Sequence, residues 1–137
     1  MRVYERTLEF GWEGDNGLGA RLIRQIIAGT KTATCSPLFS YTEEELTAVY
    51  ASKGELVTVV DKEQRPHCTV CVIDVFQTPF GDPDQRLVSG EGDGDDVGKF
   101  QQDHRMDWKD WLAAEGYTLM DETILVVEVF ELIDVAP

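Results

Sequence analysis

A lysine and a threonine three residues apart are the first candidates for chemistry in this sequence. Lys31 and Thr34 lie in the polar segment 30–36, where they offer an amine and a hydroxyl. A threonine hydroxyl becomes a good nucleophile only when a neighbouring base removes its proton, and a desolvated lysine can be that base. Glu91 opens the segment Glu-Gly-Asp-Gly-Asp, whose glycines allow a tight turn that fixes the carboxylate. We interpret these three as candidate catalytic residues, although each also suits a solvated loop or turn.

Other polar residues could contact a substrate around these three. The candidates are Arg21, Thr32, Ser36, Arg65, His104 and Arg105. The arginines are scattered along the chain and form a weak footprint beside the basic stripes of nonspecific RNA binders. This pattern favours a small ligand or one flipped nucleotide over a long RNA track. His104 shares a helical spacing with Trp108 and Trp111, which is more typical of a core than of a base-stacking platform.

The cysteines and acidic residues give little sign of a metal. Cys68 and Cys71 are three residues apart in a strand pattern, so their side chains point to opposite faces, with Cα atoms about 10 Å apart. We expect both to pack in the core. The acidic segment lacks the spacing of an EF-hand calcium loop. No metal ligands or cofactor are therefore predicted, with a looser magnesium or manganese site through Glu91, Asp93 and Asp95 left as an alternative.

Glu128 is the odd residue in the last hydrophobic segment of the chain. The residues that share its expected strand face are apolar. A carboxylate in such a place needs a partner, or its pKa shifts upward. Lys31 and Arg105 are the candidate partners, and the sequence leaves the choice open.

Hydrophobic periodicity predicts the elements that must position these side chains. Residues 16–28 form an amphipathic helix that Gly29 ends, and the polar segment 30–36 follows as a loop. Thr42 and Glu45 have the spacing of a capping box at the start of a short helix. The remaining predicted elements are a β-hairpin of strands 56–60 and 68–76, a helix over residues 96–114, and a central strand over residues 123–133. Strands separated by helices, together with a hairpin, favour an α+β fold.

Composition bounds the class of protein further. A chain of 137 residues has the size of one domain, so we expect a single domain over residues 1–137. It has no apolar run near the roughly 20 residues that cross a bilayer, and its start lacks the pattern of a signal peptide. With an odd number of cysteines, this predicts a cytoplasmic protein without a membrane partner. The net charge of −14 repels polyanions, so DNA is not expected and RNA would need a local basic cleft.

The segment 21–34 resembles the signature of the ASCH (activating signal cointegrator homology) family, whose core reads G-x-K-x-x-T. Gly29, Lys31 and Thr34 occupy those places. Further matching features follow in the same order along nearly the whole chain. They are Phe10-Gly11, Pro66 before a strand, the segment from Glu91 to Asp95, an aromatic residue four positions before His104, and a last strand ending Val-Phe-Glu-Leu-Ile.

The resemblance implies a fold and a range of functions. Members of the family look like PUA-like domains, which implies a small mixed β-barrel with helices flanking its openings. It implies recognition of RNA or of a modified nucleoside, with hydrolysis in some branches. A nucleoside amidohydrolase acting on an N-acylated nucleobase is the first expectation for Lys31, Thr34 and Glu91. A ribonuclease that uses the same cleft, with or without a metal ion, and a non-catalytic RNA-binding module are the alternatives. Ser36 departs from the amidohydrolase branch, which often has arginine there.

Overall fold

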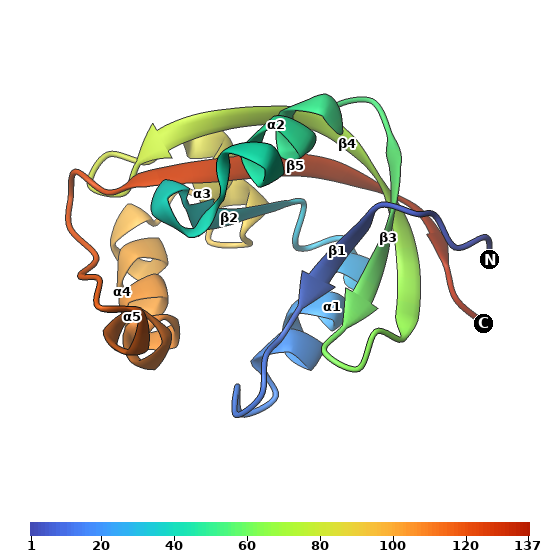
Figure 1. Cartoon of the computed structure of the whole chain (residues 1–137), viewed down its shortest axis with the longest axis horizontal. Coiled ribbons are helices and arrows are strands. Elements are labelled where there is room, and N and C mark those ends of the chain that lie inside the picture. Colours follow the sequence, from blue (N-terminus) through green and yellow to red (C-terminus); the bar gives the residue numbers. More distant parts are fainter.

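Strands and helices are mixed along the chain in the computed structural model, which describes residues 1–137 (Figure 1). The strands are β1 (Thr7–Phe10), β2 (Ala33–Pro37), β3 (Leu56–Asp61), β4 (Pro66–Pro79) and β5 (Ile124–Val135). The helices are α1 (Leu18–Ala28), α2 (Glu43–Ala51), α3 (Gln85–Gly90), α4 (Val97–Asp107) and α5 (Lys109–Glu115), with a 3₁₀ turn η1 (Leu38–Ser40). No helix is long and apolar enough to span a membrane.

One five-stranded sheet organises the molecule. Its order is β1-β3-β4-β5-β2, with β1 and β3 parallel and the other neighbouring pairs antiparallel. The long strands β4 and β5 run together across the molecule (Figure 1). The predicted α+β class is confirmed, and β5 lies inside the sheet as expected. The predicted closed barrel is not confirmed, because no strand pairing joins the edge strands β1 and β2.

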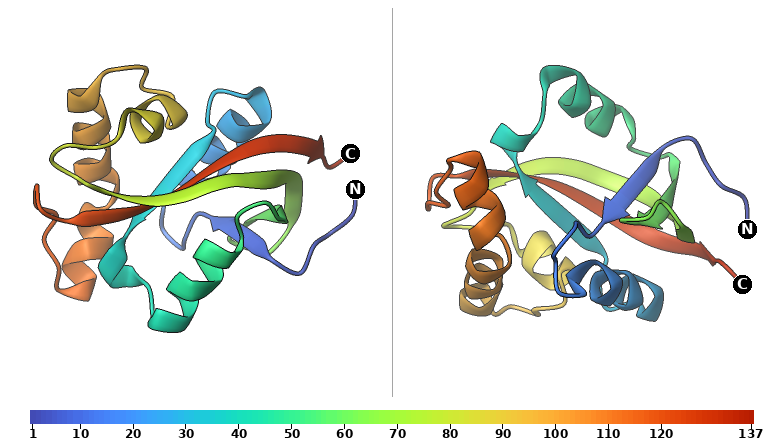
Figure 2. Two further views of the ribbon diagram at one scale, coloured as in Figure 1. Left: turned by 90° about the horizontal axis from the view of Figure 1, so that it is seen from above. Right: turned by 60° about the horizontal axis from the view of Figure 1, so that its bottom comes forward.

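The sheet separates two hydrophobic clusters. The first includes Ile23 and Ile26 of α1, Phe10 of β1 and Val126 and Phe130 of β5. The second gathers side chains from α3, α4, α5 and the opposite face of β2 and β5, including Ala33, Leu87, Phe100, Leu112 and Val127. Helices α3, α4 and α5 lie at one end of the molecule, while α1 lies near β1 and β3 (Figure 2). Strand β2 therefore has a different environment on each face.

The predicted loop over residues 30–36 is partly wrong, because residues 33–37 form the edge strand β2. Its residues alternate between buried and half-buried positions, with Ala33 and Cys35 facing the second cluster. The segment looks polar because Thr34 and Ser36 occupy the other face. Small and β-branched residues of this kind suit a pleated edge strand. Polarity alone thus concealed a period-two pattern.

The predicted helix over residues 96–114 is two helices. Helix α4 ends at Asp107 and α5 begins at Lys109. Trp108 joins them and is itself buried in the second cluster, together with Leu112. The chain turns at Trp108 so that Trp108 and Leu112 both reach the second cluster. Hydrophobic periodicity along the sequence does not predict this break between two helices.

Two predicted helix-end signals and the predicted hairpin are confirmed, while the first helix begins at Leu18 and not at residue 16. Gly29 ends α1 with φ of 83°, a conformation that glycine adopts without steric cost. Thr42 and Glu45 form a complete capping box at the start of α2. Strands β3 and β4 pair as the predicted antiparallel hairpin. Both cysteines of β4 are free thiols: Cys68 packs in the first cluster as predicted, whereas Cys71 is half-buried and lies outside it.

Candidate functional site

Lys31 is a buried lysine and not an exposed loop residue. The backbone amides of Thr30 and Lys31 both donate to the carbonyl oxygen of Gln25, so the chain folds back tightly after α1. The Lys31 side chain then runs inward and is only 2% exposed. Its Nζ donates to the backbone oxygen of Ala33 at 2.7 Å and to Oε1 of Glu91 at 3.0 Å. Burial without these partners would be costly, so the fold has built them in.

Glu91 reaches Lys31 because the end of α3 packs closely against the start of β2. A Cβ atom added at Gly90 would lie 2.4 Å from the Cβ of Ala33, so only glycine permits this approach without a shift. The amide of Thr32 donates to the Gly90 oxygen at 2.7 Å and fastens the two segments. The contact between Lys31 and Glu91, two of the three candidate catalytic residues, thus follows from one small residue on each side. With side chains 1% and 10% exposed, they form a largely buried ion pair.

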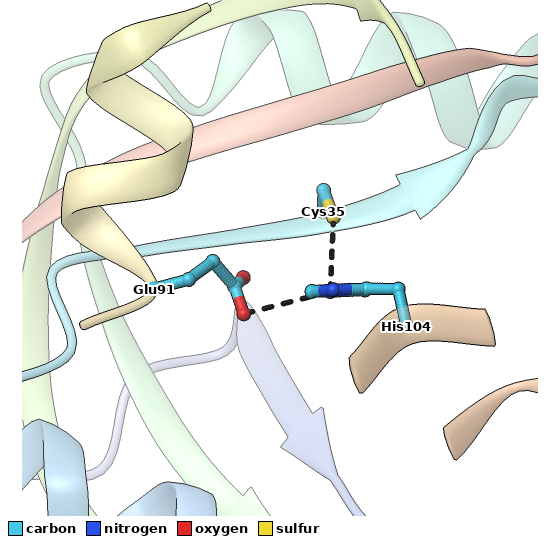
Figure 3. A group of neighbouring side chains, drawn as sticks. All are labelled: Cys35, Glu91 and His104. Atoms are coloured by element: carbon cyan, nitrogen blue, oxygen red, sulfur yellow. Dashed lines mark hydrogen bonds and ion pairs between the residues drawn. The ribbon is translucent and has the colours of Figure 1, made fainter. Parts of the chain in front are cut away.

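His104 of α4 joins this pair, and Cys35 of β2 joins His104 (Figure 3). His104 Nε2 lies 3.6 Å from Oε2 of Glu91 and 3.7 Å from Sγ of Cys35. Its Nδ1 lies 2.8 Å from the Phe100 oxygen, which can only accept, so Nδ1 carries a proton. Burial raises the pKa of the Cys35 thiol well above its ordinary value; the Glu91 charge adds to this and the Lys31 charge opposes it.

Cys35 was not among the candidates from the sequence. It follows Thr34 directly, and recognition of β2 as a strand would have placed it opposite Thr34. The signal that could have found it is the alternation of Ala33, Cys35 and Pro37 with Thr34 and Ser36.

Thr34 does not join Lys31 and Glu91, because it lies on the opposite face of β2. No hydrogen bond links its side chain to either residue. Across the sheet, Thr34 is paired in register with Glu128 of β5. Residues paired in this way on antiparallel strands have Cβ atoms about 4.5–5.5 Å apart. The three candidate catalytic residues therefore divide into a Lys31–Glu91 pair and a separate Thr34 beside Glu128.

Glu128 is a buried carboxyl group without a hydrogen-bond partner. It is 7% exposed. Burial raises its pKa from 4.5 to about 7, and the charge of Arg6 opposes this. The predicted partners are wrong, since Lys31 bonds Glu91 and Arg105 lies 3.9 Å from Asp121. The alternative from the sequence, an upward shift of the pKa, describes this carboxyl.

Two cavities adjoin these groups. The first, of about 390 Å³, is lined on its polar side by Glu91, His104 and Arg21. The second, of about 510 Å³, has a lining that includes Thr34, Cys35, Ser36, Tyr41, Glu128 and Trp111. Leu22 lines both, and the contact between Cys35 and His104 joins a residue of one lining to a residue of the other. Lys31 lies behind both cavities and contributes to neither lining.

Tyr41 adds a hydroxyl to the second cavity. Burial raises its pKa to about 12, and the charge of Glu128 adds to this. The phenol therefore keeps its proton at neutral pH and can donate a hydrogen bond into the cavity.

The remaining predicted contact residues are spread over the surface. Arg21 lies at the first cavity, 4.0 Å from Asp107. Thr32 is exposed and contributes its backbone. Arg65 pairs with Asp61 at 3.0 Å on the β3–β4 turn. Neither Arg65 nor Arg105 lines the two cavities, so the arginines do not form one basic patch.

The acidic segment after α3 is divided among separate partners. Glu91 bonds Lys31, while Asp93 lies 2.9 Å from Nζ of Lys99. Asp95 is exposed. Two of the three carboxylates proposed as an alternative magnesium or manganese site thus face lysines, and that alternative stays a prediction.

The fold and this arrangement define an α+β domain with a buried lysine–glutamate pair beside two cavities. The chain belongs to the ASCH domain family, which matches it over residues 9–134. It is similar to the crystal structure of a protein from Enterococcus faecalis, with a TM-score of 0.78 and 24% identity over 98% of this chain and 80% of that chain. An ASCH domain from Lactobacillus crispatus gives a TM-score of 0.72 and 19% identity over 96% and 82% of the two chains. No curated protein sequence matches this chain.

Proposed function

We propose that this protein binds a modified nucleoside and hydrolyses an acyl amide on its nucleobase. The observation that carries the proposal is the cavity of about 510 Å³, in which the hydroxyls of Thr34 and Ser36 accompany the buried carboxyl of Glu128. Small-ligand pockets usually have volumes of about 300–1,000 Å³. The family is generally suggested to bind RNA, which supports a ligand of nucleotide chemistry.

The lining of this cavity suits a nucleobase. Trp12 and Trp111 both belong to it and offer faces for stacking. A carboxylate accepts a hydrogen bond from the exocyclic nitrogen of cytosine, so Glu128 can hold the N–H of an N-acylated base. Thr34, its partner in register, then lies beside the acyl carbonyl.

The charge around the first cavity favours a nucleoside over an RNA chain. Four acidic residues line it against Arg21 and Lys99, and the whole chain carries a net charge of −14. A polyphosphate backbone approaching this region meets repulsion, whereas an uncharged nucleoside does not. A ligand of low charge therefore fits better than RNA. DNA carries the same phosphate charge as RNA and meets the same repulsion.

In the proposed reaction the Thr34 oxygen attacks the acyl carbon. The C–N bond breaks, the acyl group passes to the threonine oxygen, and water then cleaves this ester to a carboxylic acid. Glu128, with a pKa near 7, can give a proton to the leaving nitrogen at neutral pH. The Thr34 hydroxyl proton passes to the carboxylate form of Glu128, its partner in register, which returns a proton to the leaving nitrogen. Lys31 and Glu91, expected from the sequence to be the base and its acid–base partner, lie on the opposite face of β2 and bond each other, so in this reaction they support β2 and do not touch the substrate.

Incubation of the protein with N-acylated cytidines tests the proposal. Chromatography should show free cytidine and the carboxylic acid. Thr34→Val should lower turnover by about 10²–10⁴, the range expected when a catalytic group is lost. Lys109→Ala, at an exposed site in α5, is the matched control and should retain turnover. Equal turnover by the wild type and Lys31→Met would show that the reaction does not need Lys31.

Two rival functions give different outcomes. Cleavage of labelled RNA that stops on addition of a chelator would identify a metal-assisted ribonuclease. Saturable RNA binding that weakens steeply with salt, without any product, would identify a binding module. Either result, with N-acylated cytidines left intact, contradicts the proposal.

A further inference from the structure

Cys35, Glu91 and His104 converge from three separate elements. Cys35 lies on β2, Glu91 follows α3, and His104 lies on α4 (Figure 3). One sulfur, one carboxylate oxygen and one imidazole nitrogen all lie within 4.8 Å of one another. None of the three is exposed, with Glu91 and His104 side chains at 10% and 12%.

Two of the three separations are close to those of ligands around a tetrahedral ion, and the third, between Cys35 and Glu91, is at most 4.8 Å. Zinc lies about 2.3 Å from a thiolate sulfur and about 2.0–2.1 Å from nitrogen or oxygen, so its ligand atoms lie about 3.3–3.6 Å apart. Here Sγ of Cys35 lies 3.7 Å from Nε2 of His104, which lies 3.6 Å from Oε2 of Glu91. Movements of a few tenths of an ångström would bring these two pairs to ligand distance.

The surrounding hydrogen bonds leave the ligand atoms free and oriented. Nδ1 of His104 donates to the Phe100 oxygen at 2.8 Å, which directs the lone pair of Nε2 toward Cys35 and Glu91. Lys31 occupies Oε1 of Glu91, so Oε2 faces His104. Outer contacts of this type fix the tautomer and ring orientation in metal sites.

The charges near the cluster are mixed. Asp93, Asp103 and Asp107 line the same cavity as Glu91 and His104, where Lys99 pairs with the first two and Arg21 lies 4.0 Å from Asp107. The ammonium of Lys31 bonds Glu91 and opposes a metal ion, so the negative charge that favours the ion comes mainly from the Cys35 thiolate that forms on binding. Because the cluster provides three ligands at the edge of a cavity, a fourth position stays open to water or a ligand, as in catalytic zinc sites.

We propose that Cys35, Glu91 and His104 bind one thiophilic divalent transition-metal ion, represented by zinc. Binding forms a sulfur–metal bond and releases the thiol proton of Cys35 to solvent. The mixed sulfur, nitrogen and oxygen donors favour zinc or cobalt over magnesium or calcium. This inference does not rest on the proposed hydrolysis, because metal binding can be measured without any nucleoside.

Titration of the chelator-treated full chain with Co²⁺ and Zn²⁺ tests the site. We expect one equivalent to bind, with a thiolate-to-cobalt charge-transfer band that zinc abolishes. His104→Ala should bind at least tenfold more weakly, and Cys35→Ser should lose the band. Cys71→Ser is the matched control, since Cys71 is a free thiol of β4 outside this cluster, and it should keep both the band and the affinity.

A second measurement covers the case in which a variant fails to fold. X-ray absorption of the zinc-loaded wild type should show one sulfur among nitrogen and oxygen ligands. A shell without sulfur, no stoichiometric binding, or an unchanged charge-transfer band in Cys35→Ser would each overturn the inference.

Discussion

A glutamate from another segment lies beside each face of β2, and the two side chains differ in their partners. On the face of Cys35, Glu91 bonds Lys31 and approaches His104. On the face of Thr34, Glu128 has no hydrogen-bond partner, and burial raises its pKa to about 7. Burial alone therefore does not set the surroundings of a carboxyl group. A lysine lies within hydrogen-bond distance of Glu91, whereas no cation bonds Glu128, whose pKa burial raises.

Among the substitutions that test the two glutamates, removal of Lys31 should lower the free energy of unfolding the most. Lys31→Met leaves Glu91 buried without its cation, which should lower the free energy of unfolding by about 3–5 kcal/mol. Urea denaturation at pH 7 measures the loss. Lys31→Met combined with Glu91→Gln should recover much of it, because no uncompensated charge is left buried. A loss below about 1 kcal/mol in the single variant would mean that the pair is not buried as described.

Glu128→Gln should remove a pH dependence from stability. The folded protein holds this proton up to about pH 7, whereas the unfolded chain releases it near 4.5. Wild-type stability should therefore fall as pH rises from about 4.5 to about 7, by on the order of 3 kcal/mol. The variant should lack this fall and be the more stable protein at pH 8. Urea denaturation of both proteins at pH 4 and pH 8 measures it, and a pH-independent difference would contradict a raised pKa.

Gly90→Ala should disturb the Cys35 face through packing. The new methyl group would meet the Cβ of Ala33 at 2.4 Å, and overpacking of this kind costs about 1–3 kcal/mol. Thermal unfolding measures the change. Gly94→Ala has open space around its Cβ but a positive φ of 61° that Gly90 does not share, so it measures the cost of backbone strain without a clash. A loss at Gly90 no larger than that at Gly94 would show that the close approach does not hold Glu91 in place.

Arg105→Ala should have the smallest effect. Its guanidinium is half exposed, lies 3.9 Å from Asp121 and does not line either cavity. Exposed pairs of this geometry contribute at most about 1 kcal/mol and often nothing measurable. Isothermal titration with an N-acylated cytidine should give a dissociation constant within twofold of the wild type. A tenfold loss would return Arg105 to the set of contact residues.

The sequence predicted those features that depend on residues close together in the chain, such as helix ends and the hairpin. Gly29 ends α1 because a left-handed residue can close a helix, and Thr42 with Glu45 starts α2 through reciprocal hydrogen bonds. The β3–β4 hairpin follows from two β-rich runs around a polar turn. The family followed from the ordered motif that begins at Gly29, and the resemblance grouped Lys31, Thr34 and Glu91, of which the fold brings Lys31 and Glu91 together.

Strand pairing and chain packing decided the rest. The sequence places Thr34 and Cys35 side by side, yet in β2 a single residue step sends one toward Glu128 and the other toward His104. Whether segment 33–37 pairs with β5 depends on residues 88 to 96 positions away, and local polarity carries no record of that contact. Long-range packing brings Glu91 to Lys31 and His104 to Cys35. It also leaves Glu128 buried without a hydrogen-bond partner. The sequence alone determined which groups are available for chemistry, and tertiary packing determined which of them meet.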